Sequence, residues 1–212
     1  MLPGSRSWSV MMLAALALGM LTAAQAQADH VDAKPDTNFD THGQVMVDGR
    51  QTPYRIRRLP VSSFPELPAA VAATLTAHGC VIPQTYEAKR PENVIHASLE
   101  RAGSRDWAVL CSAQGEVSLL VFFASGLANG GEPVILAKRA ETKCLATENG
   151  GGRMGFDWGI DPAGPKRVHE AQSGMAHRLP MLDHDCVAES EVNGKTIYHL
   201  YRNGSWETVP TE

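Results

Sequence analysis

Apolar and polar residues follow different patterns along this 212-residue chain, and its longest apolar run lies at the N-terminus. Residues 10–21 are almost all apolar, Arg6 precedes them, and two Ala-x-Ala sequences follow. A positive start, a short apolar core and small residues at the end are the layout of a secretory signal peptide. The apolar core has about a dozen residues, whereas a membrane-spanning helix needs roughly 20. We therefore expect residues 1–28 to direct export and to be removed, with a mature chain that begins at Gln27 or Asp29.

A polar segment without periodicity comes next. Residues 29–43 carry many charged and polar side chains, which predicts a flexible arm. Beyond it, two extended runs flank Asp48-Gly49, and this pair is typical of a tight hairpin turn because both central positions need positive φ. Pro53 has no N–H to donate, so the second strand of this hairpin is expected at a sheet edge. We expect a single disulfide-bonded domain over residues 44–212.

One segment has a clear helical period. Leu67, Val71 and Leu75 recur at i, i+4 and i+8, with several alanines between them. Gly79 follows where a left-handed C-terminal cap is needed. The pattern predicts a helix over about 66–78, and its small side chains would let it approach a sheet closely.

Short apolar runs separated by turn residues fill most of the remaining chain. The continuous apolar run at 119–123 indicates a strand covered on both faces, one of them by the helix. Asn193-Gly194 and Asn203-Gly204 separate alternating runs, which predicts C-terminal β-hairpins, whereas residues 161–166 read as a loop. Other strands are expected at 94–99, 107–112, 117–124 and 134–137. These patterns together predict an α+β fold: a twisted antiparallel sheet, one principal helix and C-terminal β-hairpins.

The charge balance gives no case for a nucleic-acid or anionic-membrane partner. The chain has 19 basic and 23 acidic side chains, and removal of Arg6 with the signal peptide leaves 18 and 23, a net charge of −5. Such a net charge gives no electrostatic support for binding a polyanion. No second apolar run is long enough to span a membrane after signal cleavage. One basic cluster, Arg50, Arg55, Arg57 and Arg58, is interpreted as a solvated strand face, with an anion site as the alternative.

Four cysteines lie in the mature chain: Cys80, Cys111, Cys144 and Cys186. An even number of cysteines in an exported chain favours disulfides over free thiols. Metal ligation is the rival interpretation, but no two of them have Cys-x-x-Cys spacing. Of the three possible connectivities we favour Cys80–Cys111 and Cys144–Cys186, which keep each bridge within one half of the chain.

No catalytic motif is present in the sequence. There is no Gly-x-Ser-x-Gly, His-Glu-x-x-His, Walker or Gly-x-Gly-x-x-Gly pattern. His169, His177 and His184 are spaced eight and seven residues apart, which matches no zinc pattern. Asp183 and Asp185 lack the third acid and the glycine of a calcium loop. We therefore expect no bound metal or cofactor.

Several motifs resemble those of a group of exported bacterial proteins without an assigned activity. The motifs are Gly79-Cys80-Val81-Ile82-Pro83-Gln84, Asp106-Trp107-Ala108-Val109-Leu110-Cys111-Ser112 and a C-terminal hairpin from Tyr201 to Gly204-Ser205-Trp206. In that group a helix precedes the Gly-Cys pair. Its members often have His-Asp-Gly-Ile where this chain has His184-Asp185-Cys186-Val187, so the resemblance implies that Cys186 is an additional cysteine with Cys144 as its partner. It covers roughly residues 65–125 and 180–209 and implies no activity.

The function expected from the sequence is that of an exported, non-enzymatic binding or structural module of the cell envelope. Its location would be periplasmic or secreted, and its partner would be an envelope component or another exported protein. The alternative is a hydrolase of envelope material with a dispersed acidic site, using acids such as Glu116, Asp157 or Asp161. That alternative requires two carboxylates that face one cleft.

Overall fold

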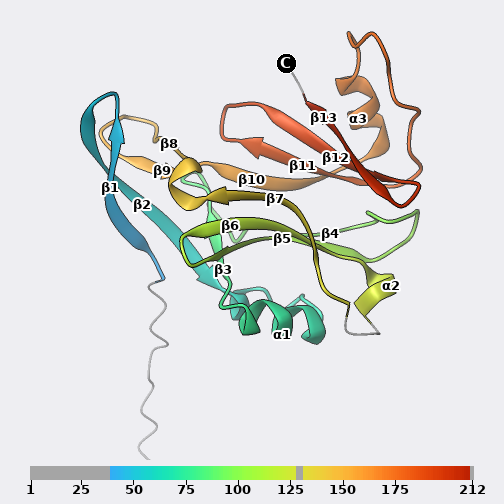
Figure 1. The fold of residues 1–212 in the computed structure, drawn as a ribbon, viewed down its shortest axis with the longest axis horizontal. Coiled ribbons are helices and arrows are strands. Elements are labelled where there is room, and N and C mark those ends of the chain that lie inside the picture. The colour runs from blue at the N-terminus through green and yellow to red at the C-terminus, as the bar shows by residue number, and fades with distance from the viewer. Residues whose placement is uncertain (1–38, 128–130, 211–212) are drawn as a thin grey trace, which may run out of the picture. The chain divides into compact units, whose positions relative to one another are not determined.

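The structure is rich in strands and contains two sheets (Figure 1). This computed structural model describes residues 39–127 and 131–210, of which 47% are in strands and 15% in helices. The two sheets form a β-sandwich-like fold. The predicted α+β class with one principal helix is therefore wrong. The predicted signal peptide, residues 1–28, and the predicted arm up to residue 38 lie outside the described residues.

The elements follow one another along the chain with mostly short connections. The strands are β1 (Thr41–Val47), β2 (Arg50–Pro60), β3 (Val81–Gln84), β4 (Val94–Ala97), β5 (Asp106–Ala113), β6 (Glu116–Phe122), β7 (Val134–Ala140), β8 (Leu145–Thr147), β9 (Met154–Phe156), β10 (Trp158–Ala163), β11 (Cys186–Glu191), β12 (Thr196–Arg202) and β13 (Ser205–Pro210). The helices are η1 (Val61–Ser63), α1 (Ala69–Ala77), α2 (Ala124–Leu127), η2 (Glu141–Lys143) and α3 (Pro165–Ala171).

The thirteen described strands divide into a large sheet and a small sheet. The large sheet has nine strands in the order β7-β6-β5-β3-β2-β9-β8, with β1 beside β2 and β4 beside β5. The small sheet has the order β10-β11-β12-β13. The predicted Asn-Gly hairpins join β11 to β12 and β12 to β13, and Asn193 and Asn203 have φ values of 56° and 51°. Strand β10 pairs with β11 and completes a sheet that is separate from the large one. Residues 161–163 of β10 were predicted to be part of a loop, and that prediction is wrong.

The N-terminal hairpin differs from its prediction in two respects. Strand β1 begins at Thr41, so the last residues of the predicted arm are part of the sheet. Strand β2 lies inside the sheet rather than at its edge, because β3 and β9 pair with it on the side opposite β1. Pro53 is nevertheless tolerated: at that residue β2 pairs only with Gln44 of β1, and the ladder to β9 begins at Tyr54.

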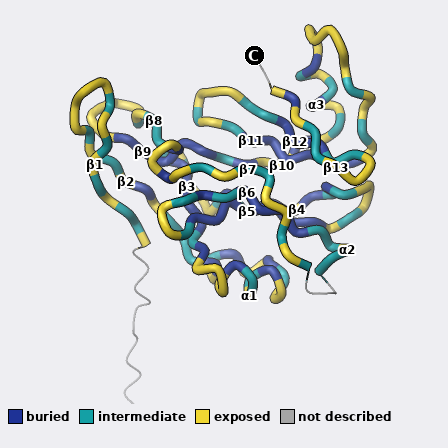
Figure 2. The backbone as a smooth tube through the Cα atoms, in the orientation of Figure 1, coloured by how far each residue is buried: buried dark blue, intermediate teal, exposed yellow. Residues whose placement is uncertain are grey.

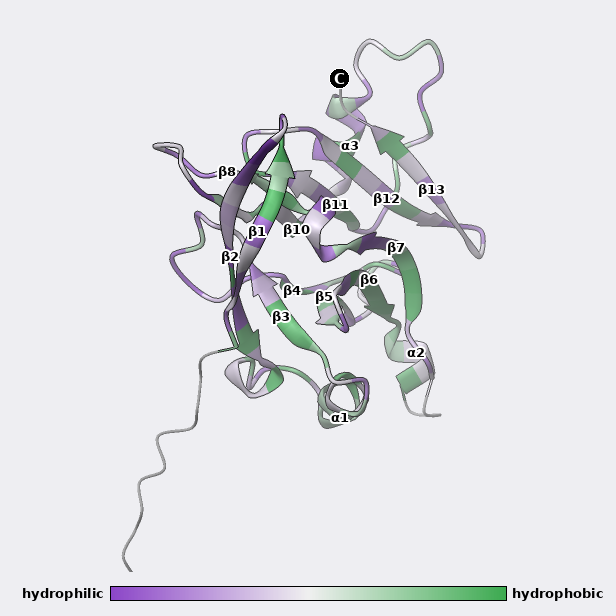
Figure 3. Ribbon diagram, turned by 60° about the vertical axis from the view of Figure 1, so that its left-hand side comes forward, coloured by the Kyte–Doolittle hydropathy of each residue, from purple (hydrophilic) through white to green (hydrophobic). Residues whose placement is uncertain are grey.

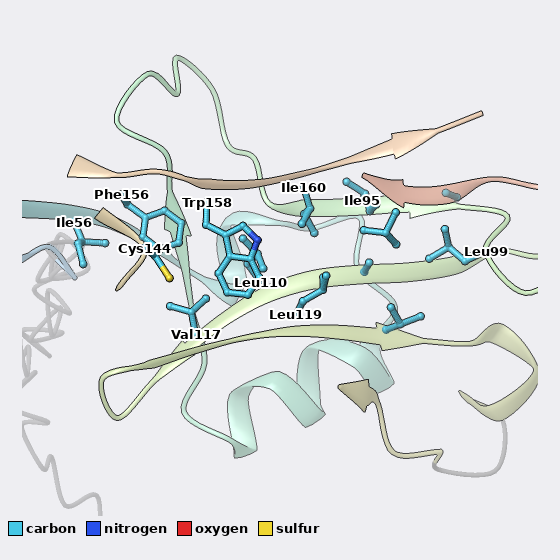
Figure 4. Close-up of a cluster of buried hydrophobic side chains, with 14 residues drawn as sticks. Ile56, Ile95, Leu99, Leu110, Val117, Leu119, Cys144, Phe156, Trp158 and Ile160 are labelled. Carbon is cyan, nitrogen blue, oxygen red and sulfur yellow. The ribbon is translucent and has the colours of Figure 1, made fainter. Parts of the chain in front are cut away.

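The main hydrophobic core lies between the two sheets (Figure 4). Leu110 and Leu119 enter it from the large sheet, and Trp158 and Ile160 enter it from the small sheet; all four are at most 4% exposed. Side chains from the facing sides of two packed sheets interdigitate in this way in β-sandwiches. The predicted hairpins and strands therefore bury their apolar faces against each other.

Helix α1 covers the outer face of the large sheet. Val71 and Leu75 are fully buried there against Val109 and Leu120. The helix starts at Ala69 and is shorter than predicted, since Pro68 precedes it in an extended conformation. Strand β5 is buried along nearly its whole length because the core between the sheets covers one face and α1 covers the other.

Helix α3 covers the outer face of the small sheet, which the sequence did not predict. Val168 packs there against Tyr198 and Leu200 of β12, with Ala188 of β11 beside them. Figure 2 shows buried strand segments beneath an α3 region whose following loop is largely exposed. Each sheet therefore has one face in the shared core and a helix against the other.

Candidate functional site

Strand β7 forms an edge of the large sheet. It pairs with β6, and no other described strand pairs with its second edge. The strand begins with four apolar residues and ends with Lys138, Arg139 and Ala140, a change that Figure 3 shows along its length. Val134 and Ile135 are 36% and 55% exposed. Edge strands are normally protected by charges or proline, but on β7 the charges lie toward one end and leave the apolar half open.

A groove of about 700 Å³ lies beside β7 on the face of the large sheet that carries α1. Leu120 and Ile135 supply apolar lining, and Cys111 lines it next to Ala77 at the end of the helix. The disulfide between Cys80 and Cys111, with Cα atoms 5.1 Å apart, confirms the first predicted bridge. It ties the chain at the end of α1 to β5, so one wall of the groove is covalently fixed.

Charged side chains stand around this groove. Glu116 and Lys138 form an ion pair at 2.5 Å, and both side chains are about half exposed. Glu132 and His78 also line it. An exposed ion pair contributes little stability. The charges lie around an exposed apolar strip formed by Val134 and Ile135, whereas Leu120 is buried at the floor of the groove.

The opposite face of β7 carries a buried ionic cluster. Arg139 forms an ion pair with Glu189 of β11, whose other carboxylate oxygen accepts a hydrogen bond from Nε2 of His199 at 2.6 Å. The guanidinium carbon of Arg139 also lies 4.3 Å from the centre of the Trp158 ring. Glu189 and His199 are 3% and 6% exposed. Removal of one partner from such a cluster leaves an uncompensated buried charge, so the cluster holds β7 in place against the small sheet.

The three acids of the predicted hydrolase do not line one cavity. Glu116 lines the β7 groove, whereas Asp161 lines a separate polar cleft of about 480 Å³ beside β10. Asp157 lines neither of these two; it is buried and accepts a hydrogen bond from the N–H of Val192 at 2.8 Å. Burial raises the pKa of Asp157, with a further contribution from nearby carboxylates such as Glu191. The structure therefore offers no observation in favour of paired catalytic acids from this set.

The histidines considered as a zinc set are not brought together. Both ring nitrogens of His184 are engaged, Nδ1 with Asp183 at 2.8 Å and Nε2 with the carbonyl oxygen of Tyr201 at 2.9 Å. The hydrogen bond with His184 lowers the pKa of Asp183. Within residues 39–127 and 131–210, no group of three or more His, Cys, Asp or Glu side chains is arranged to hold a metal ion.

Cys144 and Cys186 are free and buried, so the predicted second disulfide is wrong for this structure. Cys144 belongs to the core between the sheets, whereas Cys186 belongs to the cluster under α3 on the outer face of the small sheet. The small sheet therefore lies between the two thiols. Burial raises the pKa of each to about 12, which keeps both thiols protonated and poorly nucleophilic at neutral pH.

The basic cluster is divided by strand alternation and by neighbouring carboxylates. Arg55 pairs with Asp40 at 2.6 Å, while Arg58 points to the other face of β2 and pairs with Glu141. Arg50 lies exposed at the start of β2. Two of the four cations are therefore already neutralised, which favours the interpretation as a strand face over an anion site.

No protein-family model, curated protein or solved structure matches this chain. No helix within the described ranges is long and apolar enough to cross a membrane.

The sequence did not reveal the features that define this region. It predicted a strand at 134–137 but gave no signal that no other described strand would pair with its second side. The buried cluster did leave a signal: Glu189 and His199 occupy core-facing positions of alternating strands, where a charged side chain requires a partner.

Proposed function

We propose that this chain is an exported binding module of the cell envelope that takes up an extended segment of another exported protein along β7. Export is supported by the signal-peptide pattern of residues 1–28 and by the Cys80–Cys111 disulfide, because such bonds persist in oxidising compartments. The observation that carries the proposal is the apolar edge of β7, with which no second described strand pairs, beside a groove of about 700 Å³.

A peptide strand that pairs with β7 would gain main-chain hydrogen bonds without any change in the sheet. Its alternate side chains, spaced two residues apart at about 3.3 Å per residue, would lie beside Ile135 on the face of the sheet that carries the groove. The lining beside β7 is apolar at Leu120 and Ile135 and charged at Glu116, Lys138 and Glu132. The preferred segment is therefore one with aliphatic residues at alternate positions and polar residues between them.

The pairing requires backbone hydrogen bonds, which gives a direct test. The probe is a fluorescent decapeptide of alternating valine and lysine, and the control probe is the same peptide with N-methylated valines. Fluorescence anisotropy should detect binding of the first peptide and not of the second. Hydrogen exchange should slow in residues 134–139 when the first peptide is present.

A matched pair of variants tests the place of binding. Ile135→Asp should weaken binding by at least about tenfold, because a carboxylate would be desolvated in the apolar strip. Met46→Asp is the control, since Met46 is a comparably exposed apolar side chain, at 61%, on the distant strand β1. The proposal would be overturned by equal affinity for the two peptides. It would also be overturned if Ile135→Asp and Met46→Asp lost the same amount of affinity for the first peptide.

A further inference from the structure

A narrow hollow between α3 and the small sheet brings together a cysteine, a methionine and a histidine. Cys186 of β11, fully buried and free, lines it from the sheet. His169 lines it from α3, and Met181 lines it from the loop that returns from the helix to β11 (Figure 1). Met181 is 62% exposed, so its flexible side chain lies at the solvent side of the hollow.

Each of these side chains has an uncommitted ligand atom. Nδ1 of His169 is buried and has no hydrogen-bond partner among the described residues. Sγ of Cys186 is not in a disulfide. The thioether of Met181 is a soft donor by nature. His184, the nearest histidine in sequence to Cys186, differs because both of its ring nitrogens are already hydrogen-bonded.

We propose that this hollow is a site for a soft monovalent metal cation of the Cu(I) class, bound by Sγ of Cys186, Sδ of Met181 and Nδ1 of His169. Thiolate and thioether ligands select Cu(I), whereas Mg²⁺ and Ca²⁺ prefer oxygen ligands. The hollow is too narrow to hold a water molecule, which excludes an ion that keeps part of its hydration shell. When the Cu–S bond forms, the thiol proton leaves to solvent, and neither the metal nor the sulfur changes oxidation state.

Two side-chain hydrogen bonds hold the loop that carries Met181. The amide oxygen of Gln172, itself buried at the end of α3, accepts a hydrogen bond from the N–H of Leu179 at 2.6 Å. Arg202 of β12 donates to the carbonyl oxygen of Pro180 at 2.6 Å. The residue before Met181 is therefore tied to the small sheet, which fixes the backbone of the loop beside the hollow that Met181 and Cys186 line.

The sequence alone could not point to this set. His169 lies seventeen positions before Cys186 and twelve before Met181, and these spacings match no metal pattern. The proposal concerns the small sheet and is independent of peptide binding at β7 on the large sheet.

The test is an anaerobic titration of the exported full chain, with its disulfide intact, using Cu(I) supplied as its acetonitrile complex. The chromophoric chelator bicinchoninate serves as the competitor. We expect one tightly held ion per chain and a sulfur-to-copper absorption band in the near ultraviolet. X-ray absorption should show both sulfur and nitrogen neighbours.

Three variants and one matched control locate the ion. Cys186→Ser and His169→Leu should each lower the affinity by about 100-fold or more, since even changes around metal ligands cost 10- to 100-fold. Met181→Leu should lower it by about tenfold, and because Met181 is exposed this variant keeps its fold. Cys144→Ser removes the other buried free thiol and should leave the affinity unchanged.

The outcomes that overturn the proposal are equally specific. The first is that the full chain fails to compete with bicinchoninate for Cu(I). The second is an equal loss of Cu(I) affinity in Cys144→Ser and Cys186→Ser. The third is an unchanged Cu(I) affinity in Met181→Leu. Circular dichroism melting of each variant separates loss of the ligand from loss of the fold.

Discussion

The two outer faces of the sandwich are built alike but are fastened differently. On the large sheet, α1 buries Val71 against β5, and a cysteine beneath it, Cys111, is bonded to Cys80 at the end of the helix. On the small sheet, α3 buries Val168, and the cysteine beneath it, Cys186, is free. A covalent bond holds the end of α1 to the large sheet, whereas hydrogen bonds and packing hold α3 and its following loop to the small sheet.

This difference predicts different behaviour in the two faces. A helix held by a crosslink and a large buried cluster opens only with the whole domain, whereas a short helix followed by an exposed loop opens locally. Residues 173–178 after α3 are all exposed. The first face therefore serves stability, and local opening of the second would admit a small ion to the buried donors of the proposed site.

The largest effect expected at neutral pH comes from removal of the bond on the first face. Cys80 and Cys111 are 31 residues apart, and a crosslink over that length contributes about 3–4 kcal/mol in the chain-entropy model. The double variant Cys80→Ala/Cys111→Ala should lose about that much free energy of unfolding, measured by urea denaturation. Cys186→Ala removes a buried sulfur without a crosslink and should lose only about 1 kcal/mol. Similar losses in both would contradict the contrast.

The two helices offer a second comparison through an identical substitution. Val71 and Val168 are 0% and 2% exposed. Val71→Ala should lower the global free energy of unfolding by about 2 kcal/mol, because it leaves a cavity in a face that cannot relax. Val168→Ala should lower it by less and should instead speed hydrogen exchange in residues 165–182. The comparison fails if exchange rises equally throughout the domain in both variants.

The sequence predicted local features better than the arrangement of layers. Turn signals at Asn193-Gly194 and Asn203-Gly204, and the continuous apolar run of β6, depend on a few neighbouring residues, and each matches the structure. The fold class failed because the C-terminal hairpins joined β10 to make a separate sheet. That pairing joins Pro162 with Val187, a contact across 25 residues that no local pattern encodes.

The pairing of the cysteines shows the same limit. Cys80 directly follows the predicted helix, so local order placed it near the strand that the helix covers. Cys144 and Cys186 gave no such signal, and alternation along β11 turns Cys186 toward α3 and away from the core that holds Cys144. Neighbouring residues of a strand face opposite sides of the sheet, so the position of Cys186 in β11 places its thiol on the side away from Cys144.

The two free thiols provide a pH test of their burial. Their pKa values are raised from 9.0 to about 12 in the folded protein, so only the unfolded chain releases these protons between pH 9 and 12. The stabilising contribution is complete below pH 9 and is lost as the pH rises toward 12, with a slope of about 1.4 kcal/mol per pH unit for each thiol. In metal-free protein, Cys186→Ser and Cys144→Ser should each remove about half of the slope that the two thiols contribute. An unchanged slope in Cys186→Ser would show that its thiol is already accessible to solvent.

The smallest expected effect concerns the hydrogen bonds that fasten the α3 face. Gln172 is 1% exposed, and its amide oxygen accepts the N–H of Leu179. Gln172→Met keeps the side-chain volume and removes that acceptor, at a cost of about 1 kcal/mol because the half-buried N–H of Leu179 can still reach water. Hydrogen exchange should quicken in residues 173–182 and stay unchanged in α1. Gln51→Met on the exposed part of β2 is the control and should change neither region. Faster exchange in α1 as well would mean that the two faces open together, and the contrast between a covalently closed face and a loosely held one would then be lost.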